Sequence, residues 1–206
     1  MVKDHLFIVF GAEHYNPLNV IRSIGKSGIA PIFIAVKNKG LIASKSKYIQ
    51  KTHYVDSVEQ GYEILLQEYG NLKKKPFLFT TDDDVQSYLD MRYDELIDKF
   101  YFFQAGKAGR VTEFMDKKKV LELAARHGLK VLPTVVVNHG HVPNDLVYPV
   151  LTKSISPNVG GWKKDVHICN SAEELKAAYD RILSPRVVIQ QYLDKKNEYT
   201  IDGFSI

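Results

Sequence analysis

Apolar runs alternate with amphipathic stretches along the first hundred residues of the chain. Such runs are typical of strands that are buried on both faces of a parallel sheet, and they occupy residues 5–10, 31–36, 76–80 and 101–103. Between the second and third runs, apolar side chains recur at every third or fourth position across residues 62–69, which is the spacing of a helix with one buried face. The alternation predicts an α/β fold with a Rossmann-like parallel sheet and right-handed crossovers.

The pattern changes near residue 105. Residues 104–109 are small and polar, and we interpret them as a linker. Beyond the linker, the predicted order is a helix from Asp116, strands at residues 131–137, 148–153 and about 165–169, a helix after Ser171, and a strand at 187–193. We therefore predict two domains: residues 1–108 with the parallel sheet, and residues 109–206 with an α+β arrangement that is incomplete at Ile206.

Three of the predicted helices begin with a capping signal. Ser57 is followed three residues later by Gln60, and Ser171 by Glu174, which is the capping-box arrangement. Asp116 directly precedes an amphipathic stretch and can accept hydrogen bonds from its first amides.

Composition and charge narrow the class of protein. The net charge of +4 reflects lysine clusters, but no aromatic stacking platform or nucleic-acid motif accompanies them, so we predict no nucleic-acid partner. No apolar stretch approaches the roughly 20 residues that span a bilayer, and no secretory signal is present, so we predict no membrane partner. The single cysteine, Cys169, excludes an internal disulfide and fits a reducing cytoplasm.

Two familiar phosphate motifs and one metal site can be set aside. Residues 25–27 read Gly-Lys-Ser, but a P-loop also needs glycine five positions before Gly25, where Val20 stands. Gly11 follows the first strand without the further glycines of a dinucleotide fingerprint. The acidic residues 82–84 are explained by the start of a helix, where carboxylates are favoured, better than by a metal.

Two lysines stand in different kinds of predicted structure. Lys117 lies in the first turn of the helix that Asp116 caps, where the helix dipole favours anions. Lys153 ends the apolar run 148–153, and a charge in such a strand needs a partner or a route to solvent. A helix-borne and a strand-borne cation together suit a polyphosphate. The alternatives are a solvent-facing lysine run at 117–119 and an edge lysine at 153.

The segment between the predicted strands at 148–153 and 165–169 is longer than a hairpin needs. Gly160 and Gly161 permit close approach of the backbone to phosphate oxygens, and Lys163 adds positive charge. Long loops in compact domains are often functional lids, so we expect this loop to close over phosphates. The alternative is a flexible hairpin anchored by Trp162.

The last predicted strand leads into a polar linker. Consecutive backbone groups of Gln190, Gln191, Tyr192 and Leu193 can match the hydrogen-bonding edge of a purine. Glu198 lies far enough along the chain to accept hydrogen bonds from ribose hydroxyls.

Taken in order, these segments resemble the amino-terminal portion of the ATP-grasp superfamily, in particular its carbamoyl-phosphate-synthase-like and carboxylate–amine ligase members. The resemblance covers essentially the whole chain and is carried by residues 46–48, 80–82, 116–117, 128–133, 148–153, 190–193 and 198–202. The fold it implies is a Rossmann-like pre-ATP-grasp domain followed by the first, α+β part of an ATP-grasp domain. The chain departs from the pattern at Gln190, where glutamate is frequent, and in a loop that is poor in glycine.

The resemblance implies an ATP-dependent ligase that joins a small carboxylate to an amine or thiol through an acyl phosphate. We expect a cytoplasmic protein whose amino-terminal domain contributes to substrate choice or to the contacts of a homodimer. Lys117, Lys153 and the glycine loop would contact the phosphates of ATP, and residues 190–193 would contact adenine. The residues that bind Mg²⁺ in this family would lie beyond Ile206, so the chain is expected to be an inactive fragment of a longer enzyme. The alternative is a non-catalytic nucleotide-binding or interaction module on the same scaffold.

Overall fold

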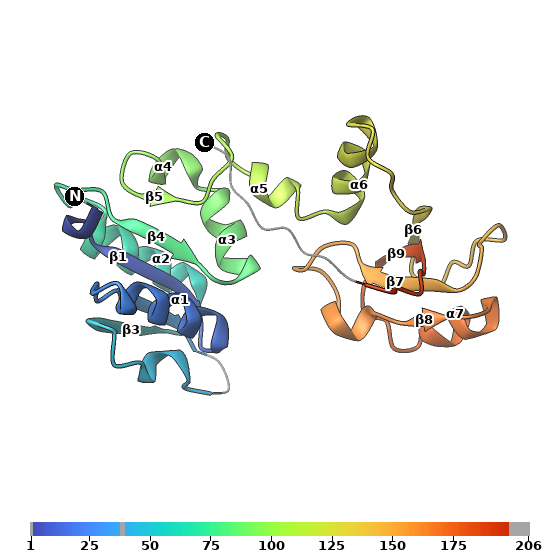
Figure 1. Cartoon of the computed structure of the whole chain (residues 1–206), viewed down its shortest axis with the longest axis horizontal. Helices are drawn as coiled ribbons and strands as arrows, with labels where there is room; N and C mark the ends of the chain where they lie inside the picture. The colour runs from blue at the N-terminus through green and yellow to red at the C-terminus, as the bar shows by residue number, and fades with distance from the viewer. Residues whose placement is uncertain (1, 38–39, 198–206) are drawn as a thin grey trace. The chain divides into compact units, whose positions relative to one another are not determined.

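Two separate β-sheets organise the chain, each within its own unit (Figure 1). The computed structural model describes residues 2–37 and 40–197. The first unit is Met1–Met115 and the second is Asp116–Ile206.

The first unit contains a five-stranded, entirely parallel sheet in the order β3-β2-β1-β4-β5. Its strands are β1 (Phe7–Ala12), β2 (Ile32–Val36), β3 (Lys51–Val55), β4 (Phe77–Thr80) and β5 (Tyr101–Phe102). Its α-helices are α1 (Tyr15–Lys26), α2 (Val58–Ile64), α3 (Asp83–Asp90), α4 (Tyr93–Leu96) and α5 (Arg110–Glu113). Shorter helical turns are η1 (Val2–Asp4), η2 (Ala43–Lys45) and the π-helical η3 (Leu65–Tyr69) that continues α2. The Rossmann-like parallel sheet predicted from the sequence is confirmed.

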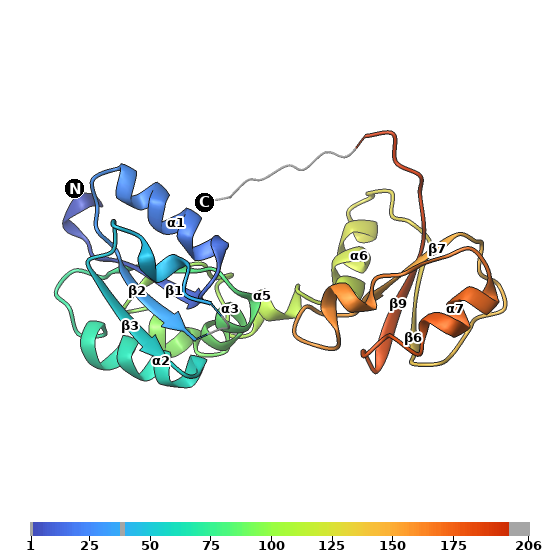
Figure 2. The same cartoon turned by 90° about the horizontal axis from the view of Figure 1, so that it is seen from below.

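The central strands are apolar throughout because both faces of the sheet are covered. Ile8 and Phe10 of β1 pack into a core with α2 and α3, whereas Val9 packs with Ile21 of α1 on the opposite face. Figure 2 shows α1 and α2 on the two sides of this sheet. Each of these fully buried side chains contributes about 1.5–3 kcal/mol of hydrophobic free energy. The alternation of side chains along a strand thus turns one apolar run into two cores.

Strand β3 has no apolar run and is not predicted from the sequence. Lys51, Thr52 and His53 make most of it polar, and only Val55 is buried. It lies at the edge of the sheet, where one side faces no other strand, so pairing with β2 suffices to form it.

The second unit contains a four-stranded antiparallel sheet in the order β6-β9-β7-β8. Its strands are β6 (Thr134–Asn138), β7 (Val150–Ser154), β8 (Ile168–Cys169) and β9 (Arg186–Gln191). Its helices are α6 (Lys117–Arg126), α7 (Ala172–Ala178) and the 3-10 helix η4 (Trp162–Asp165). The α6 and α7 helices lie on opposite sides of this sheet in both views (Figures 1 and 2). The α+β arrangement predicted for this part of the chain is confirmed.

The two faces of this second sheet are packed differently. Leu175 and Ala178 of α7 are buried against Val150 and Ile189 of the sheet. Helix α6, by contrast, has no buried residue. The face on the α6 side is therefore the more accessible of the two.

Replacement of Gly61 in α2 by alanine tests the packing of the first core. Alanine normally favours a helix over glycine by about 1 kcal/mol. Here a Cβ would lie 2.7 Å from Phe10 Cε2 and 3.1 Å from Ile34 Cγ2, so we expect Gly61→Ala to destabilise the protein by about 1–3 kcal/mol. Urea denaturation followed by circular dichroism measures the change. Glu63→Ala, at an exposed position of the same helix, is the control and should be close to neutral.

Candidate functional site

Lys153 and Gln190 meet on the α6 side of the second sheet. Lys153 Nζ lies 3.3 Å from Gln190 Oε1, and Gln190 Nε2 donates to Thr134 Oγ1 at 2.9 Å. The predicted lysine and the first predicted hinge residue are therefore neighbours, joined across three strands. Among residues 2–37 and 40–197, no carboxylate forms an ion pair with Lys153. Within the same residues its hydrogen-bond partner is a neutral amide, so the ammonium charge is available to an anion.

Lys117 begins α6 next to the end of the strand that carries Lys153. Its backbone N–H donates to the carbonyl of Ile155, two residues beyond Lys153, at 3.0 Å. Asp116 accepts from the amides of Lys118 at 2.8 Å and Lys119 at 3.1 Å, which confirms the predicted cap. Because this cap occupies two amides of the first turn, an anion here would depend on the Lys117 side chain more than on the helix end.

A cavity of about 400 Å³ separates α6 from β6 on the same face of the sheet. Leu121 of α6 and Val136 of β6 line it, together with Thr134, the partner of Gln190. The helix therefore does not close over this face, and the polar chain from Lys153 to Thr134 remains accessible to a ligand.

The two adjacent glycines of the long loop lie where the loop packs closely against Asp165 and Ser184. Gly160 has a φ of +86°, and a Cβ there would collide with the side chain of Ser184. Gly161 donates its N–H to Asp165 Oδ2 at 2.8 Å. The glycines are thus explained by a tight turn, while Lys163, in η4, is exposed beside it.

Asp165 is fully buried and holds the base of this loop. Besides the Gly161 amide, its carboxylate accepts from the Leu183 amide at 2.7 Å and from the Ser184 hydroxyl. Burial works to raise the pKa of Asp165, but these hydrogen bonds outweigh it and leave the pKa below the ordinary value. The backbone carbonyl of Asp165 accepts from Thr152 Oγ1 at 2.7 Å, which ties the loop to β7. Sequence reasoning missed this residue, since an aspartate after two lysines reads as a surface charge.

Two prolines limit the backbone pairing of the predicted hinge. The amide of Gln191 donates to the carbonyl of Pro133 at 3.0 Å, and that of Tyr192 to the carbonyl of Pro149 at 2.9 Å. In an antiparallel ladder, the residue that accepts such a hydrogen bond also donates its own N–H to the carbonyl of its partner, but proline has no N–H. Neither proline can therefore donate to the carbonyl of Gln191 or of Tyr192.

The four predicted hinge residues lie where an extended segment leaves the sheet. Gln190 and Gln191 end β9 with side chains on opposite faces, and Tyr192 and Leu193 follow the strand. Glu198, the predicted ribose contact, lies outside the described residues.

A second polar cluster lies at the carboxyl ends of β1 and β4 in the first unit. Asp82 Oδ2 accepts from the Ala12 amide at 2.7 Å, and Asp82 Oδ1 lies 2.7 Å from His14 Nε2. His14 Nδ1 accepts from the Asn16 amide and caps α1, so the ring proton is on Nε2 and is donated to Asp82. Asp82 is the N-cap residue of α3, but its carboxylate makes no capping hydrogen bond and bonds outside its own helix.

Glu13 lies beside this cluster and is 2% exposed. Its Oε2 accepts from the amides of Ile42, Ala43 and Ser44 at 3.0, 2.8 and 3.2 Å. The sheet order reverses between β1 and β4, and open α/β sheets bind ligands at such a point.

Within the described ranges, no group of three or more histidine, cysteine, aspartate or glutamate side chains could hold a metal ion. In the same ranges, no helix is both long and apolar enough to cross a bilayer.

The fold described above recurs in solved structures of ligases. An L-amino acid ligase from Bacillus licheniformis aligns with a TM-score of 0.66 and 12% identity over 92% of this chain and 45% of its own. N5-carboxyaminoimidazole synthetase from Staphylococcus aureus, in complex with ADP, aligns with a TM-score of 0.68 and 16% identity. The alignment covers 93% of this chain and 48% of the synthetase. D-alanine–D-alanine ligase from Bacillus anthracis aligns with a TM-score of 0.56 and 12% identity. The alignment covers 92% of this chain and 57% of the ligase. No protein-family model matches the chain, and no curated protein matches it significantly in sequence.

The chain therefore has the fold of the amino-terminal portion of ATP-grasp ligases, which confirms the resemblance seen in the sequence. It spans about half the length of these three structures. Identities of 12–16% establish the fold alone.

Asp165→Asn tests the role of the buried carboxylate. Because the folded pKa lies below the unfolded value, Asp165 stabilises the fold above the unfolded pKa, and this contribution is lost as the pH falls through the folded pKa. We expect the asparagine variant to be about 1–3 kcal/mol less stable at pH 7, with a gap to wild type that narrows at acid pH. Urea denaturation at several pH values measures the gap. Asp180→Asn, at an exposed position, is the control, and an equal pH dependence in both variants would contradict the assignment.

Proposed function

We propose that the chain is part of an ATP-dependent ligase that joins a small carboxylate to an amine, or to a thiol, through an acyl phosphate. The observation that carries the proposal is the pairing of Lys153 with Gln190, because it unites an uncompensated cation with the start of the hinge on an accessible face. The likeness of the fold to structures solved with ADP or ATP supports the same proposal.

Each part of the site supplies one kind of contact in this proposal. The carbonyl of Gln191, which Pro133 cannot engage, is suited to accept a hydrogen bond from the amino group of adenine. The backbone amide of Leu193, two residues further along the same extended segment, is suited to donate to the same edge of adenine. Lys153 and Lys117 bind phosphate oxygens, and the loop of Gly160 and Gly161, with Lys163 beside it, covers them.

The proposed reaction needs positioning and charge neutralisation rather than acid–base side chains. A carboxylate oxygen attacks the γ-phosphorus, the bond to the β-phosphate oxygen breaks, and ADP leaves. The amine then attacks the acyl carbon, inorganic phosphate departs with the bonding electrons, and the amine loses a proton to solvent. The lysines offset charge on the phosphates during the first step. Among the described residues, no group of three or more histidine, cysteine, aspartate or glutamate side chains could hold a metal ion, so no step is assigned to a metal.

Within the first unit, the cluster of Asp82, His14 and Glu13 is a separate proposed binding site. Two carboxylates and a histidine held as a hydrogen-bond donor disfavour a phosphate and suit an amine or hydroxyl substituent of a substrate.

The alternative to a ligase is a non-catalytic nucleotide-binding module, in which nucleotide binds without carboxylate-dependent turnover.

Lys153→Ala tests the nucleotide site. A lysine–phosphate contact is charge-assisted, so its loss should weaken ATP binding about tenfold or more. Isothermal titration calorimetry with magnesium present measures the affinity, and the difference should shrink as salt is added. Lys176→Ala removes the same charge from the exposed face of α7 and should leave the affinity unchanged. Equal affinities in wild type and Lys153→Ala would mean that the nucleotide binds elsewhere.

Carboxylate-dependent release of ADP tests the ligase itself. The longest protein that contains this chain would be incubated with ATP, magnesium and a panel of small acids and amines. We expect ADP release only when a suitable acid and amine are both present, with strong loss of turnover in Lys153→Ala. Nucleotide binding with no turnover on any acid and amine would favour the non-catalytic module, and ATP hydrolysis that ignores the acid would count against a ligase.

A further inference from the structure

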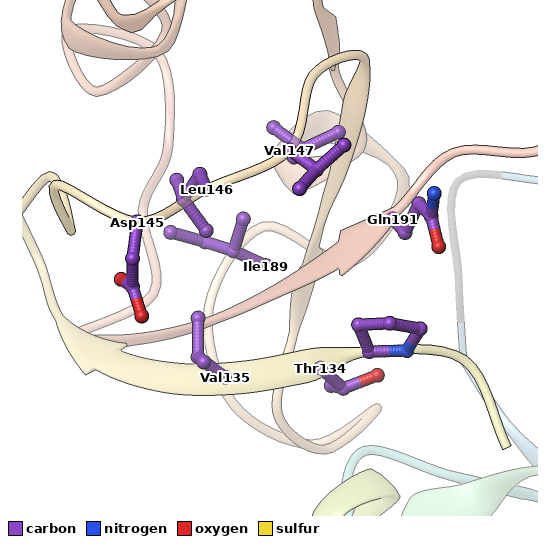
Figure 3. A pocket seen from close by; sticks show the side chains of 9 residues that line it. Thr134, Val135, Asp145, Leu146, Val147, Ile189 and Gln191 are labelled. Atoms are coloured by element: carbon purple, nitrogen blue, oxygen red, sulfur yellow. The ribbon is translucent and has the colours of Figure 1, made fainter.

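A separate pocket lies on the opposite face of the second sheet from Lys153 and Gln190. Its volume is about 350 Å³, within the range of small-molecule sites. Five aliphatic side chains form most of its wall: Val135, Leu146, Val147, Val150 and Ile189. Figure 3 shows Val135 on β6, Leu146 and Val147 on the segment that follows Asp145, and Ile189 on β9, which runs between the two.

The pocket exists because α7 covers only part of this face. Leu175 and Ala178 pack against Val150 and Ile189, whereas the side of the face near β6 is covered only by irregular chain around Leu146. Aliphatic surface consequently stays open, and Val135 is 38% and Val147 67% exposed. Such surface gains free energy when a ligand removes it from water.

Of the three polar side chains that line the pocket, Asp145 and Gln191 stand at opposite ends of its aliphatic wall (Figure 3), and the hydroxyl of Thr134 is bonded to Leu132 and Gln190. Within residues 2–37 and 40–197, neither the Asp145 carboxylate nor the Gln191 side-chain amide takes part in a hydrogen bond or ion pair. Asp145 is also the only charged residue of the lining. Because Asp145 is exposed, its carboxylate is open to an incoming group, and a ligand that covers the aliphatic wall and meets this charge has an aliphatic body and a cationic end.

We infer that the pocket binds a small aliphatic amine, with its ammonium group at Asp145 and its carbon chain against Val135, Val147 and Ile189. A polar group at the far end of the molecule would reach the Gln191 amide. A negatively charged or purely polar ligand does not fit, because it would face the carboxylate or leave the aliphatic wall unmatched.

Occupancy of the pocket is coupled to the proposed hinge. Pro133 and Gln191 both line the pocket, and the Gln191 amide is bonded to the Pro133 carbonyl at 3.0 Å. A bound amine therefore restrains the residue whose carbonyl is proposed to meet adenine. Because coupling between sites is reciprocal, the amine and the nucleotide change each other's affinity by the same factor. This coupling, unlike the amine site itself, rests on the proposed function.

Methyl NMR titration of the chain with n-pentylammonium tests the site without nucleotide. We expect saturable shifts confined to methyl groups of the lining, and weaker binding of 1-pentanol, which has the same carbon chain and no charge. Asp145→Asn should weaken pentylammonium about fivefold and leave pentanol unchanged, since only a charge-assisted contact is lost. Asp180→Asn, an equal change of charge at an exposed position in the same unit, should alter neither.

Val135→Phe and Val147→Phe, both at exposed positions, should fill the pocket and abolish binding of both probes. The proposed amine site would be refuted by the absence of saturable binding or by chemical-shift changes outside the lining. It would also be refuted if both probes bound with equal affinity, or if Asp145→Asn and Asp180→Asn had equal effects. An ATP titration at saturating pentylammonium then tests the coupling, which an unchanged ATP affinity would refute. Failure of ATP to bind at all would refute the proposed function and leave the amine site standing.

Discussion

The buried carboxylate of Asp165 is the interaction on which the candidate site depends most. It holds the turn at Gly161 and the chain at Leu183 and Ser184, just before β9, while its backbone carbonyl holds Thr152 of β7. A charge that is removed from water is tolerated only when several donors surround it, so these segments must assemble together. The glycine loop is therefore attached at its base to the two strands that carry Lys153 and Gln190.

The two faces of the second sheet differ in how tightly they are packed. On the α7 side, Leu175 and Ala178 close a core against Val150 and Ile189. On the α6 side, the linked side chains of Lys153, Gln190 and Thr134 would be costly to bury without a partner, and the loosely packed α6 leaves them accessible. Because side chains alternate along a strand, consecutive residues such as Gln190 and Gln191 serve different faces.

Backbone chemistry shapes the end of β9. Pro133 and Pro149 each accept one hydrogen bond from the hinge and cannot return it, so the sheet stops pairing at Gln191 and Tyr192. In the first unit, β1 and β4 also stop pairing at their carboxyl ends, and there the side chains of Asp82 and His14 form hydrogen bonds. In both units, polar groups thus lie at strand ends, where the backbone N–H and C=O groups no longer pair with a neighbouring strand.

The sequence by itself determined the features that depend on neighbouring residues. The buried strands follow from apolar runs, and the caps at Ser57, Asp116 and Ser171 follow from a side chain reaching amides two or three residues away. The order of these elements sufficed to predict the fold and its resemblance to ATP-grasp ligases, which the solved structures confirm.

Only the tertiary structure decided which distant residues meet. It formed the polar edge strand β3 by pairing with β2, buried Asp165, paired Lys153 with Gln190, and set prolines opposite the hinge. These contacts join residues tens of positions apart, and no local spacing encodes them. Their energies depend on burial and on partners that exist only once the sheet has formed.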